Sequence, residues 1–352
     1  MTDIRPTRTT AAPLATAPAG SSTTSGDPVD PARATLDKAA RENFPVAPFF
    51  LPRAWRDDLM ALYGYARLVD DIGDGDLAPG GGDARLLGVD PADAEDRLVL
   101  LDAFEADLRR VFDGSEATGA SETAGDSEVS GGSQESDRPD PSGDAPRHPL
   151  LVALRPTVRR RALPPGPFLG LIAANRQDQL VRRYETYDDL LAYCELSANP
   201  VGRLVLGLTG TATPERVRRS DAVCTALQII EHLQDVAEDL AADRIYLPAD
   251  DMRRFHVTEA DLAAPTGSAS VRALVAYQAE RARRLLDDGV PLVGSVHGRL
   301  RLLLAGFVGG GHAALAAITA AGHDVLPGAP KPGRARLLRE TGAVLRRARR
   351  EG

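Results

Sequence analysis

Two acidic stretches decide the fold of this chain: Arg67-Leu-Val-Asp-Asp-Ile-Gly-Asp74 and Gln234-Asp-Val-Ala-Glu-Asp239. Each contains two aspartates four residues apart, Asp70 with Asp74 and Asp235 with Asp239. Residues at this spacing lie on one face of a helix with Cβ atoms about 6 Å apart, so each pair can present two carboxylates to one metal ion. Mg²⁺ typically binds through a few carboxylates together with the phosphate oxygens of a substrate. The two stretches therefore predict magnesium-dependent diphosphate chemistry.

The sequence around each aspartate pair is apolar except for one polar stripe. Gln228, Glu231 and His232 continue the stripe before the second pair, and Tyr63 and Arg67 do so before the first. Such a pattern is typical of a helix that is buried on most sides. The polar stripe must then be paired or must line a wet cavity, because unpaired buried charge is very costly. A solvated surface pair is the alternative for either stretch alone, but two such stripes in one chain argue against it.

The length and composition suit one large helical domain or two small ones. The chain has 352 residues, 43% of them hydrophobic, and it shows helical periodicity without alternating strand patterns. We therefore predict an all-α fold. Residues 1–36 and 114–147 contain little that could be buried, and we expect both to be disordered. The predicted helical domain covers residues 37–325, with 114–147 as an insertion, and a basic C-terminal helix or tail follows over 326–352.

Charge and cysteine content exclude several classes of function. A formal net charge of −8 argues against nucleic acid as a partner. Cys194 and Cys224 lie in apolar helical patterns and cannot supply a disulfide framework or a zinc site, so we expect them to be core residues. The N-terminal tail lacks the basic start and compact apolar segment of a secretory signal, and we expect a cytoplasmic protein.

Two segments raise the question of membrane contact. Residues 302–322 are long enough to span a bilayer, but their Gly- and Ala-rich composition favours a buried helix beside a lipid-sized cavity. The basic run 334–350 carries Leu337, Leu338 and Val344 at helical spacing. This run is either a solvated terminal helix or a peripheral contact with the inner face of the membrane.

Proline, glycine and capping residues predict the helix boundaries. We expect helices to begin after Pro52, after the prolines at 164–167, at Tyr187 and at Pro214, and to cover 270–288 and 298–322. Pro200 and Gly202 should kink the helix that starts at Tyr187. The loop 75–90 directly follows the first acidic stretch. It is either a mobile flap over a metal site or an untethered surface insertion.

Further motifs give the chain a family resemblance. They are Arg67 placed three residues before Asp70, Tyr193-Cys-Glu-Leu-Ser-Ala-Asn-Pro-Val-Gly202, and Asp243-Arg-Ile-Tyr-Leu-Pro248. With the two acidic stretches, they make residues 37–325 resemble the squalene/phytoene synthases, head-to-head prenyltransferases in which glycine usually stands at the position of Asp243. The resemblance implies a single-domain, all-helical class I terpenoid synthase bundle around a central cavity. It also implies that Asp70, Asp74, Asp235 and Asp239 bind Mg²⁺.

Three features resemble one branch of this family, the hydroxysqualene synthases of bacterial hopanoid biosynthesis. They are Glu42-Asn-Phe-Pro-Val46, Ser197-Ala-Asn-Pro-Val-Gly-Arg203, and Gln234 where the coupling synthases usually have arginine. The branch implies a lyase or transferase that ionises presqualene diphosphate and lets water capture the rearranged cation, without NADPH. It also implies a functional link to the enzyme that supplies presqualene diphosphate. Glu231 departs from the family, which usually has asparagine there; it either alters the metal cluster or is neutralised by a nearby Arg or His.

Two other functions stay open at this stage. A sister enzyme would couple two prenyl diphosphates to squalene, phytoene or presqualene diphosphate, against which Gln234 and the 42–46 segment argue. A non-catalytic helical protein that binds isoprenoid diphosphates is the alternative from another class. Magnesium-dependent diphosphate release would separate that protein from both enzymes.

The motifs also suggest a role for each site residue. Arg67 and Arg244 are expected to bind diphosphate, because a guanidinium forms bidentate pairs with phosphate oxygens, although structural ion pairing is the alternative. Tyr193 is expected in the wall of the carbocation cavity or as an ordinary core tyrosine. Asp71 is expected to be an accessory metal ligand or a surface acid. The predicted catalytic residues are Tyr63, Arg67, Tyr193 and Gln234, and the predicted substrate-binding residues are Arg67, Tyr193, Asn199, Gln228 and Arg244. One of Tyr63, Asn199, Glu231 and Gln234 is expected to position the captured water.

Overall fold

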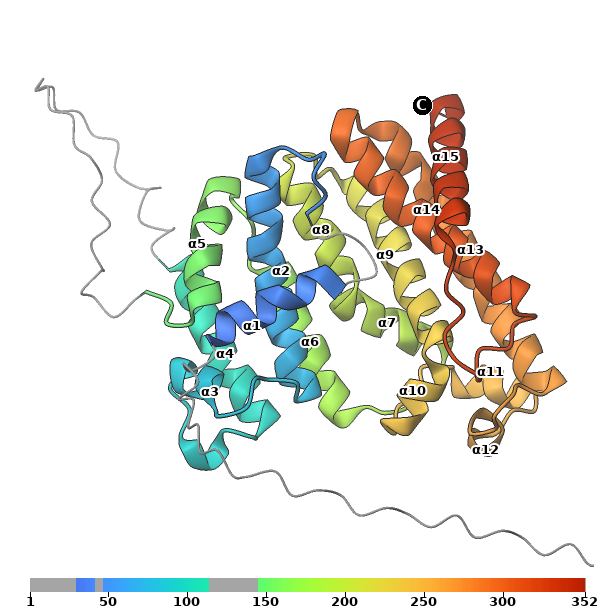
Figure 1. The fold of residues 1–352 in the computed structure, drawn as a ribbon, viewed down its shortest axis with the longest axis horizontal. Helices are drawn as coiled ribbons and strands as arrows, with labels where there is room; N and C mark the ends of the chain where they lie inside the picture. The colour runs from blue at the N-terminus through green and yellow to red at the C-terminus, as the bar shows by residue number, and fades with distance from the viewer. Residues whose placement is uncertain (1–29, 42–46, 114–144, 352) are drawn as a thin grey trace, which may run out of the picture.

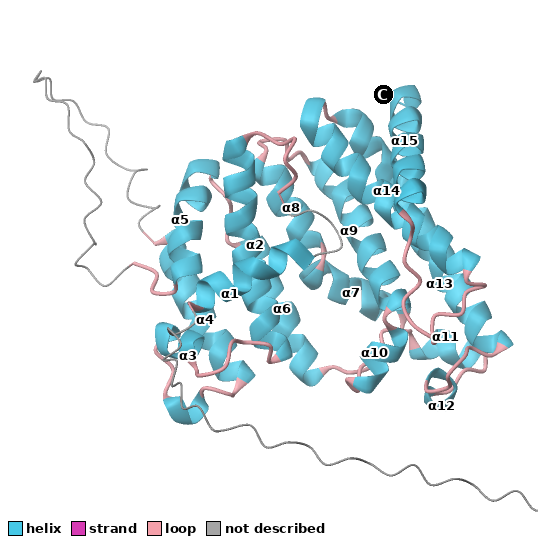
Figure 2. Ribbon diagram, viewed as in Figure 1, coloured by secondary structure: helices cyan, strands magenta, loops and turns pink. Residues whose placement is uncertain are grey.

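The computed structural model describes residues 30–41, 47–113 and 145–351 of the chain. Every regular element in these residues is a helix (Figure 2), and their one isolated β-bridge joins Arg183 to Ile245. The prediction of an all-α fold is confirmed. The segment 42–46, on which part of the family resemblance rests, lies outside the described residues.

The helices fall into two consecutive sets. The first set is α1 (Pro31–Asp37), η1 (Lys38–Arg41), α2 (Arg53–Asp74), α3 (Gly82–Leu87), η2 (Pro91–Asp93), α4 (Arg97–Phe112), α5 (Pro149–Arg161) and α6 (Gly166–Leu180). The second set is α7 (Tyr187–Ser197), α8 (Asn199–Leu208), α9 (Pro214–Gln234), α10 (Val236–Ala241), α11 (Ala249–Arg254), α12 (Glu259–Leu262), α13 (Ala269–Ser295), α14 (Gly298–Ala320) and α15 (Arg334–Glu351).

Helix α2 is central to the first set, where it packs against α1, α4, α5 and α6 (Figure 1). Helix α6 also contacts α7 and α8, and α8 packs against α9. In the second set α9 lies along α13 and contacts α14, while α15 covers α13 and α14. These contacts bring α2, α6, α8, α9 and α14 around a common centre.

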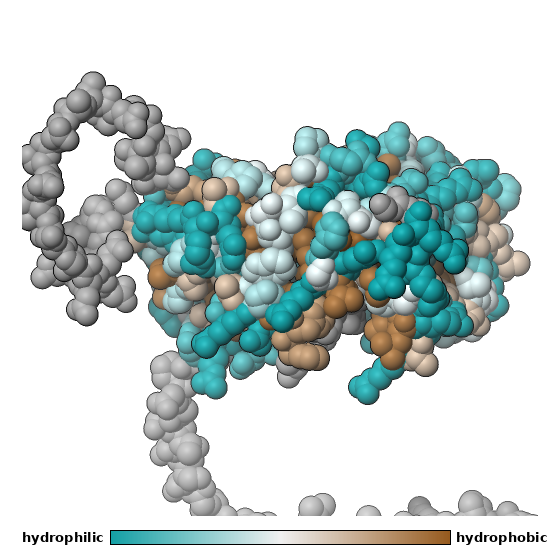
Figure 3. Space-filling view, turned by 90° about the horizontal axis from the view of Figure 1, so that it is seen from above, coloured by the Kyte–Doolittle hydropathy of each residue, from teal (hydrophilic) through white to brown (hydrophobic). Residues whose placement is uncertain are grey.

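Hydrophilic side chains cover most of the rim of the molecule when it is seen from above, and hydrophobic residues show mainly in the interior part of that face (Figure 3). The largest fully buried side chains include Tyr65, Phe104 and Phe168 from α2, α4 and α6. The centroid of the Tyr65 ring lies 5.5 Å from that of Phe104 and 5.1 Å from that of Phe168. Helices α2, α4 and α6 thus share a buried aromatic core.

The helix boundaries follow the capping residues of the sequence. Helix α2 begins directly after Pro52, and α9 begins at Pro214 with the Thr213 side chain accepting a hydrogen bond from the Arg216 amide. A capping residue followed by proline is a frequent helix start. Helix α7 ends at residue 197 and α8 begins at residue 199, so the structure has a break between two helices just before Pro200, where the sequence predicted a kink.

Glycines allow the C-terminal helices to approach closely. A Cβ atom on Gly309 of α14 would lie 2.6 Å from the Thr341 Cα of α15, and one on Gly294 of α13 would lie 2.8 Å from the Ala348 carbonyl oxygen. Helix α14 is the one described helix long and apolar enough to cross a membrane, yet 61% of its apolar window is buried within the protein. It packs as a core helix between its neighbours.

The predicted bounds of both disordered segments are wrong at their C-terminal ends. Residues 31–36 belong to α1, which is capped by Asp30 and buries Ala32. Residues 145–147 are also ordered, because the Arg147 and His148 amides each donate a 2.8 Å hydrogen bond to the buried Asp107 carboxylate. The other parts of both segments lie outside the described residues.

Packing also decides between the alternatives for the loop 75–90 and for the basic C-terminal helix. The loop 75–90 contains α3, and its buried Asp83 Oδ1 lies 3.1 Å from Nε2 of buried His148. An untethered insertion is therefore wrong for this loop. The basic terminal helix α15 is not fully solvated, since Val344 and Ala348 are buried in its contact with α13 and α14.

Candidate functional site

A cavity of about 490 Å³ lies between α2, α6, α8, α9 and α14. Its wall is mostly apolar and is formed by Leu59, Leu62, Ala66, Leu171, Val201, Leu204, Val205, Leu227, Ile230, Phe307, Gly310, Gly311 and Ala314. Its polar residues are Tyr63, Arg67 and Asp70 from α2, and Glu231 and Gln234 from α9. The fold thus brings together four residues of the two polar stripes, Tyr63, Arg67, Asp70 and Glu231, with Gln234, which the family resemblance singled out.

Asp70 lines this cavity, where its side chain is exposed to the solvent, while neighbouring protein atoms crowd its other sides. The Asn175 side-chain amide on α6 donates a 3.2 Å hydrogen bond to Asp70 Oδ1. Burial, followed by the nearby charge of Asp74, raises the pKa of Asp70 from its ordinary value of 3.8 to about 7, although the Asn175 hydrogen bond and Arg67 oppose the shift. A cation in the cavity would favour the ionised carboxylate.

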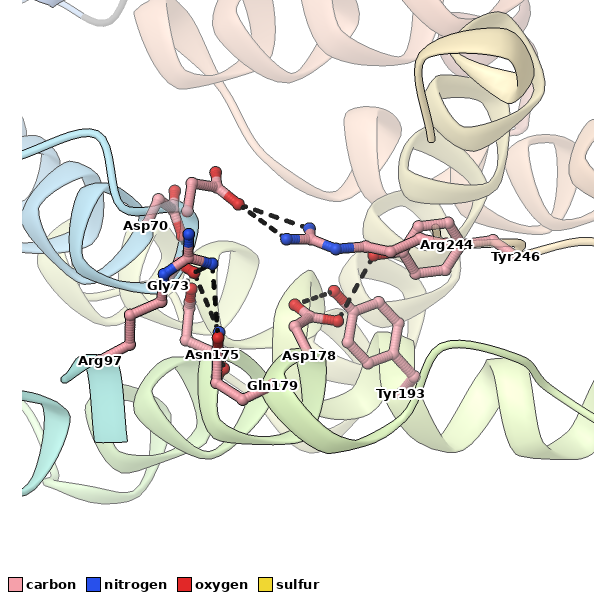
Figure 4. Close-up of polar contacts among 10 residues, drawn as sticks. Asp70, Gly73, Arg97, Asn175, Asp178, Gln179, Tyr193, Arg244 and Tyr246 are labelled. Atoms are coloured by element: carbon pink, nitrogen blue, oxygen red, sulfur yellow. Dashed lines mark hydrogen bonds and ion pairs between the residues drawn. The ribbon is translucent and has the colours of Figure 1, made fainter. Parts of the chain in front are cut away.

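The last turn of α2 is fixed against α6. A Cβ atom on Gly73 would lie 1.9 Å from the Asn175 side-chain oxygen, so the close approach of these helices requires glycine. Gln179 Nε2 and Arg97 Nη1 donate hydrogen bonds of 2.9 and 3.0 Å to the Gly73 carbonyl (Figure 4). Helix α2 then ends at Gly75, which has a φ of 77° and serves as a left-handed cap.

Asp71 is buried in the structure and is paired with two cationic side chains. Its side chain is buried, and its Oδ1 lies 2.7 Å from Lys38 Nζ and 2.8 Å from Arg67 Nε. Asp71 is therefore a buried ion-pair partner, and the prediction of a surface acid is wrong. Arg67 thus has the structural ion pair considered for it, with Asp71, and it also lines the cavity. Its binding of diphosphate stays a prediction.

The second acidic motif lies at a break between two helices. The sequence predicted one continuous helix, but α9 ends at Gln234 and α10 begins at Val236. Asp235 has φ −105° and ψ 15°, while the Asp239 amide still donates to its carbonyl at 2.8 Å. Burial and then the like charges of Glu238 and Asp239 raise the pKa of Asp235. Asp235 and Asp239 lie next to the α9 residues of the cavity but do not line it.

Arg244 links the two motifs. Its Nη2 and Nη1 atoms lie 3.3 and 3.4 Å from Asp74 Oδ1 (Figure 4), so the guanidinium spans from the segment after α10 to the end of α2. Asp243 precedes it with a φ of 59°, in the left-handed region that favours glycine, and its carboxylate pairs with Arg183 at 2.9 Å. The backbone here keeps a glycine-like conformation although the residue is aspartate.

Tyr193 belongs to an aromatic cluster centred on Asp178. The Tyr193 and Tyr246 hydroxyls donate to the Asp178 carboxylate at 2.8 and 3.4 Å (Figure 4). His232 stacks on Tyr246 with ring centroids 3.6 Å apart and an interplanar angle of 12°. Burial raises the pKa of Asp178, although the Tyr193 hydrogen bond and Arg244 oppose the shift. Tyr193 thus joins this buried cluster and is not among the residues that line the cavity.

Two predicted substrate-binding residues point elsewhere. Asn199 is buried, donates to Glu195 Oε2 at 2.8 Å and accepts from the Thr225 hydroxyl at 3.0 Å. Gln228 Nε2 lies 3.1 Å from His232 Nε2. Neither side chain lines the cavity, so the structure removes Asn199 from the residues that could position water.

Sequence reasoning missed the contribution of α6. Asn175, Asp178 and Gln179 hold Asp70, Tyr193 and Gly73 respectively. The available signal was a run of polar residues interrupting an otherwise apolar helix, but nothing in that run indicates which distant helix it faces.

The acidic residues fit a metal ion held jointly with a substrate. Among the described residues, no three acidic, histidine or cysteine side chains are grouped so that they could hold a metal ion by themselves. Asp70 is hydrogen-bonded to an amide, and the charges that most affect Asp235 are other carboxylates. Mg²⁺ needs oxygen ligands and usually completes its shell with water and phosphate. A metal ion that enters with a diphosphate would meet these requirements.

Comparisons with known proteins agree with this geometry. The sequence pattern of the squalene/phytoene synthase family matches residues 37–341. A hydroxysqualene synthase of Rhodopseudomonas palustris is 31% identical over 256 residues, which are 72% of this chain and 71% of that protein. A phytoene synthase of Arthrospira platensis is 29% identical over 256 residues, which are 68% of each protein.

A solved structure extends the similarity to three dimensions. The squalene synthase HpnC from Alicyclobacillus acidocaldarius is 37% identical to this chain, with a TM-score of 0.64. The match covers 83% of this chain and 95% of that protein. Sequence and fold lead to the same conclusion: the chain belongs to the squalene/phytoene synthase family.

Proposed function

We propose that this protein is a hydroxysqualene synthase. It would ionise presqualene diphosphate with the help of Mg²⁺ and let water capture the rearranged cation, giving hydroxysqualene and diphosphate for squalene and hopanoid biosynthesis. The observation that carries the proposal is the apolar cavity whose polar residues include Asp70, Arg67 and Gln234. Such a cavity suits an isoprenoid chain with a diphosphate at one end.

The four motif aspartates would hold the metal. Asp70 and Asp74 would act from α2, and Asp235 and Asp239 from the junction of α9 and α10. When bound, Mg²⁺ offsets the charge that develops on the departing diphosphate. Arg67, at the same cavity, can donate hydrogen bonds to phosphate oxygens.

The remaining residues would protect and shape the cation. The apolar side chains of α2, α8, α9 and α14 exclude bulk water, which would otherwise capture the cation at any exposed carbon. Tyr63 is the one aromatic side chain that α2 contributes to the cavity lining, and Phe307 of α14 is another. An aromatic ring face attracts positive charge, so both rings can stabilise a cation beside them.

The main competing function is a coupling synthase. Phytoene synthases are nearly as similar to this chain as hydroxysqualene synthases are, at 29% against 31% identity. Gln234 in the cavity favours water capture, because a neutral amide can hold water where a coupling synthase usually has an arginine. A non-catalytic protein that binds isoprenoid diphosphates is the third candidate, and the acidic residues open to the site disfavour it.

Product analysis with purified presqualene diphosphate tests the proposal. The protein should release diphosphate only with Mg²⁺ and should form an alcohol that carries ¹⁸O when the reaction runs in ¹⁸O-water, with or without NADPH. Squalene formed only with NADPH, or diphosphate release from farnesyl diphosphate alone, would favour a reducing or coupling synthase. Binding without any release would favour the non-catalytic protein.

We also propose that the protein works in the cytoplasm and touches the inner face of the membrane through α15. Leu338 is 74% exposed on this helix, and its neighbours Arg334 and Arg339 are exposed too. Basic residues around an exposed leucine suit an anionic lipid surface. Co-sedimentation with vesicles containing phosphatidylglycerol should decrease when Leu338 is replaced by aspartate, and an unchanged pellet would refute the contact.

A further inference from the structure

The side chain of Gln234 has a defined orientation. Its Nε2 donates a 2.6 Å hydrogen bond to the carbonyl oxygen of Pro330, in the connection between α14 and α15. A carbonyl oxygen can only accept, so the NH₂ group of the amide must face Pro330 and the Oε1 atom must face away from it. Within the described residues this is the one hydrogen bond of the Gln234 side chain, and Oε1 therefore remains available as an acceptor beside the cavity.

Gln234 has one other acceptor close by on the same helix face. Glu231 lies three residues earlier on α9, and both side chains line the cavity. Residues three apart are neighbours on a helix surface. Among the other polar residues of the cavity, Arg67 can only donate hydrogen bonds, Asp70 belongs to the first acidic motif, and Tyr63 lies on α2, while Asn199 does not line the cavity. Gln234 and Glu231 are thus the pair of acceptors that α9 adds to the cavity.

We infer that Gln234 Oε1 positions the water molecule that captures the cation, and that Glu231 takes up the released proton. This inference rests on the proposed function. The water would donate one hydrogen bond to Gln234 Oε1, which leaves an oxygen lone pair free to turn toward the cation. That lone pair fills the empty carbon orbital and forms the C–O bond, and the resulting oxonium gives one proton to the Glu231 carboxylate. The products are a neutral alcohol and a protonated Glu231, so charge and atoms balance.

Two substitutions at one position separate the acceptor from the tether. Gln234→Leu removes both Oε1 and the hydrogen bond to Pro330. Gln234→Glu keeps an acceptor oxygen but loses the N–H donor. With purified presqualene diphosphate and Mg²⁺ in ¹⁸O-water, we would measure diphosphate release and the share of labelled alcohol among all products. The leucine variant should lose about tenfold in alcohol share, the value of one hydrogen bond, in favour of hydrocarbon formed by proton loss. The glutamate variant should keep most of its alcohol share.

The measurements distinguish failure of this inference from failure of the proposed function. A wild-type alcohol share that persists in Gln234→Leu overturns the role of Gln234. An equal loss in both variants would assign the effect to the Pro330 tether and also overturns it. Glu231→Gln should slow alcohol formation more than diphosphate release; equal effects on both would refute its role as proton acceptor. A wild-type protein that releases diphosphate but forms no alcohol refutes the proposed function itself.

Discussion

Asp70 and Asp235 begin motifs with the same spacing, yet the fold holds the two aspartates differently. Asp70 lies within a continuous helix, receives a hydrogen bond from Asn175, and has beside it a glycine turn bound by Gln179 and Arg97. Asp235 lies at the break between α9 and α10, where its carbonyl accepts a hydrogen bond from the Asp239 amide and its own amide donates to the Glu231 carbonyl. The comparison teaches that one motif is fixed by side chains before any substrate arrives, whereas the other is held by its backbone and can adjust to metal and diphosphate.

The largest effect should come from removing a motif carboxylate. Asp70→Asn and Asp235→Asn should each reduce diphosphate release from presqualene diphosphate by about 100-fold or more, because the shape is kept while the metal loses an anionic ligand. Circular dichroism and thermal unfolding would check that both variants fold. A folded Asp235→Asn protein with a near-normal rate would mean that the first motif alone suffices.

A smaller loss is expected when the first motif is displaced without loss of charge. In Gly73→Ala the new methyl group would collide with Asn175, so α2 and α6 must separate. We expect a rate about tenfold to 100-fold lower and a stability loss of about 1–3 kcal/mol.

Gly306→Ala in α14 is the matched control for that substitution. A Cβ atom at Gly306 would meet nothing within 4 Å, and alanine favours helix by up to about 1 kcal/mol relative to glycine. Its rate and thermal midpoint should therefore be unchanged or slightly raised. Equal behaviour of the two variants would show that the first motif is not held by the α2–α6 contact.

The two motifs should also differ in pH dependence. The pKa of Asp70 is about 7, so this carboxylate is mostly protonated at pH 6 and mostly ionised at pH 8. The affinity for Mg²⁺ with diphosphate, measured by calorimetry, should rise about tenfold over this range beyond the rise seen in Asp70→Asn, which shares the titration of the ligand. Parallel curves for the two proteins would contradict the shift.

The same raised pKa predicts the sign of a stability effect in the metal-free protein. Between pH 4 and pH 7 the folded state holds a proton on Asp70 that the unfolded state has released, so this group's stabilising contribution is complete below pH 4 and is lost as pH rises to about 7. Thermal unfolding of wild type and Asp70→Asn in EDTA should therefore diverge toward pH 8, with the wild type the less stable.

The smallest effect should follow loss of the Lys38 ammonium group, which pairs with Asp71 of the first motif. Lys38→Ala removes one of the two partners of buried Asp71 but leaves Arg67 in place. Because Lys38 is partly exposed, we expect a cost of about 1 kcal/mol, or a thermal midpoint lower by about 2–4 °C. A drop of more than 10 °C would mean that Lys38 holds the whole N-terminal segment.

The sequence predicted those cavity residues that are related by helical spacing within one helix. Tyr63, Arg67 and Asp70 share one face of α2, and helical periodicity alone placed them together. Periodicity likewise placed Glu231 on the polar stripe of α9, whereas Gln234 was singled out by the family resemblance. Asn175 could not be assigned in this way, because its partner Asp70 lies on another helix 105 residues away. Local periodicity does not say which helices meet.

For Asp71 and Asn199, too, the sequence did not reveal the packing partners. Each was given a functional role from its place beside a motif, but Lys38 neutralises Asp71 and Glu195 with Thr225 occupies Asn199. These partners become visible only when the helices are packed. The break at Asp235 was likewise hidden, because the residues around it have ordinary helical propensity.

The close contact of α15 with Gly294 of α13 and Gly309 of α14 has a consequence for mutations in the gene. The 18 residues of α15 pack against Gly294 and Gly309, positions at which any larger side chain would collide with the backbone of α15. A frameshift or early stop codon that removed α15 would leave an apolar groove on α13 and α14 open to solvent. Such a lesion would lower the amount of protein in the cell, through aggregation and proteolysis, more than it would lower the turnover of each surviving molecule.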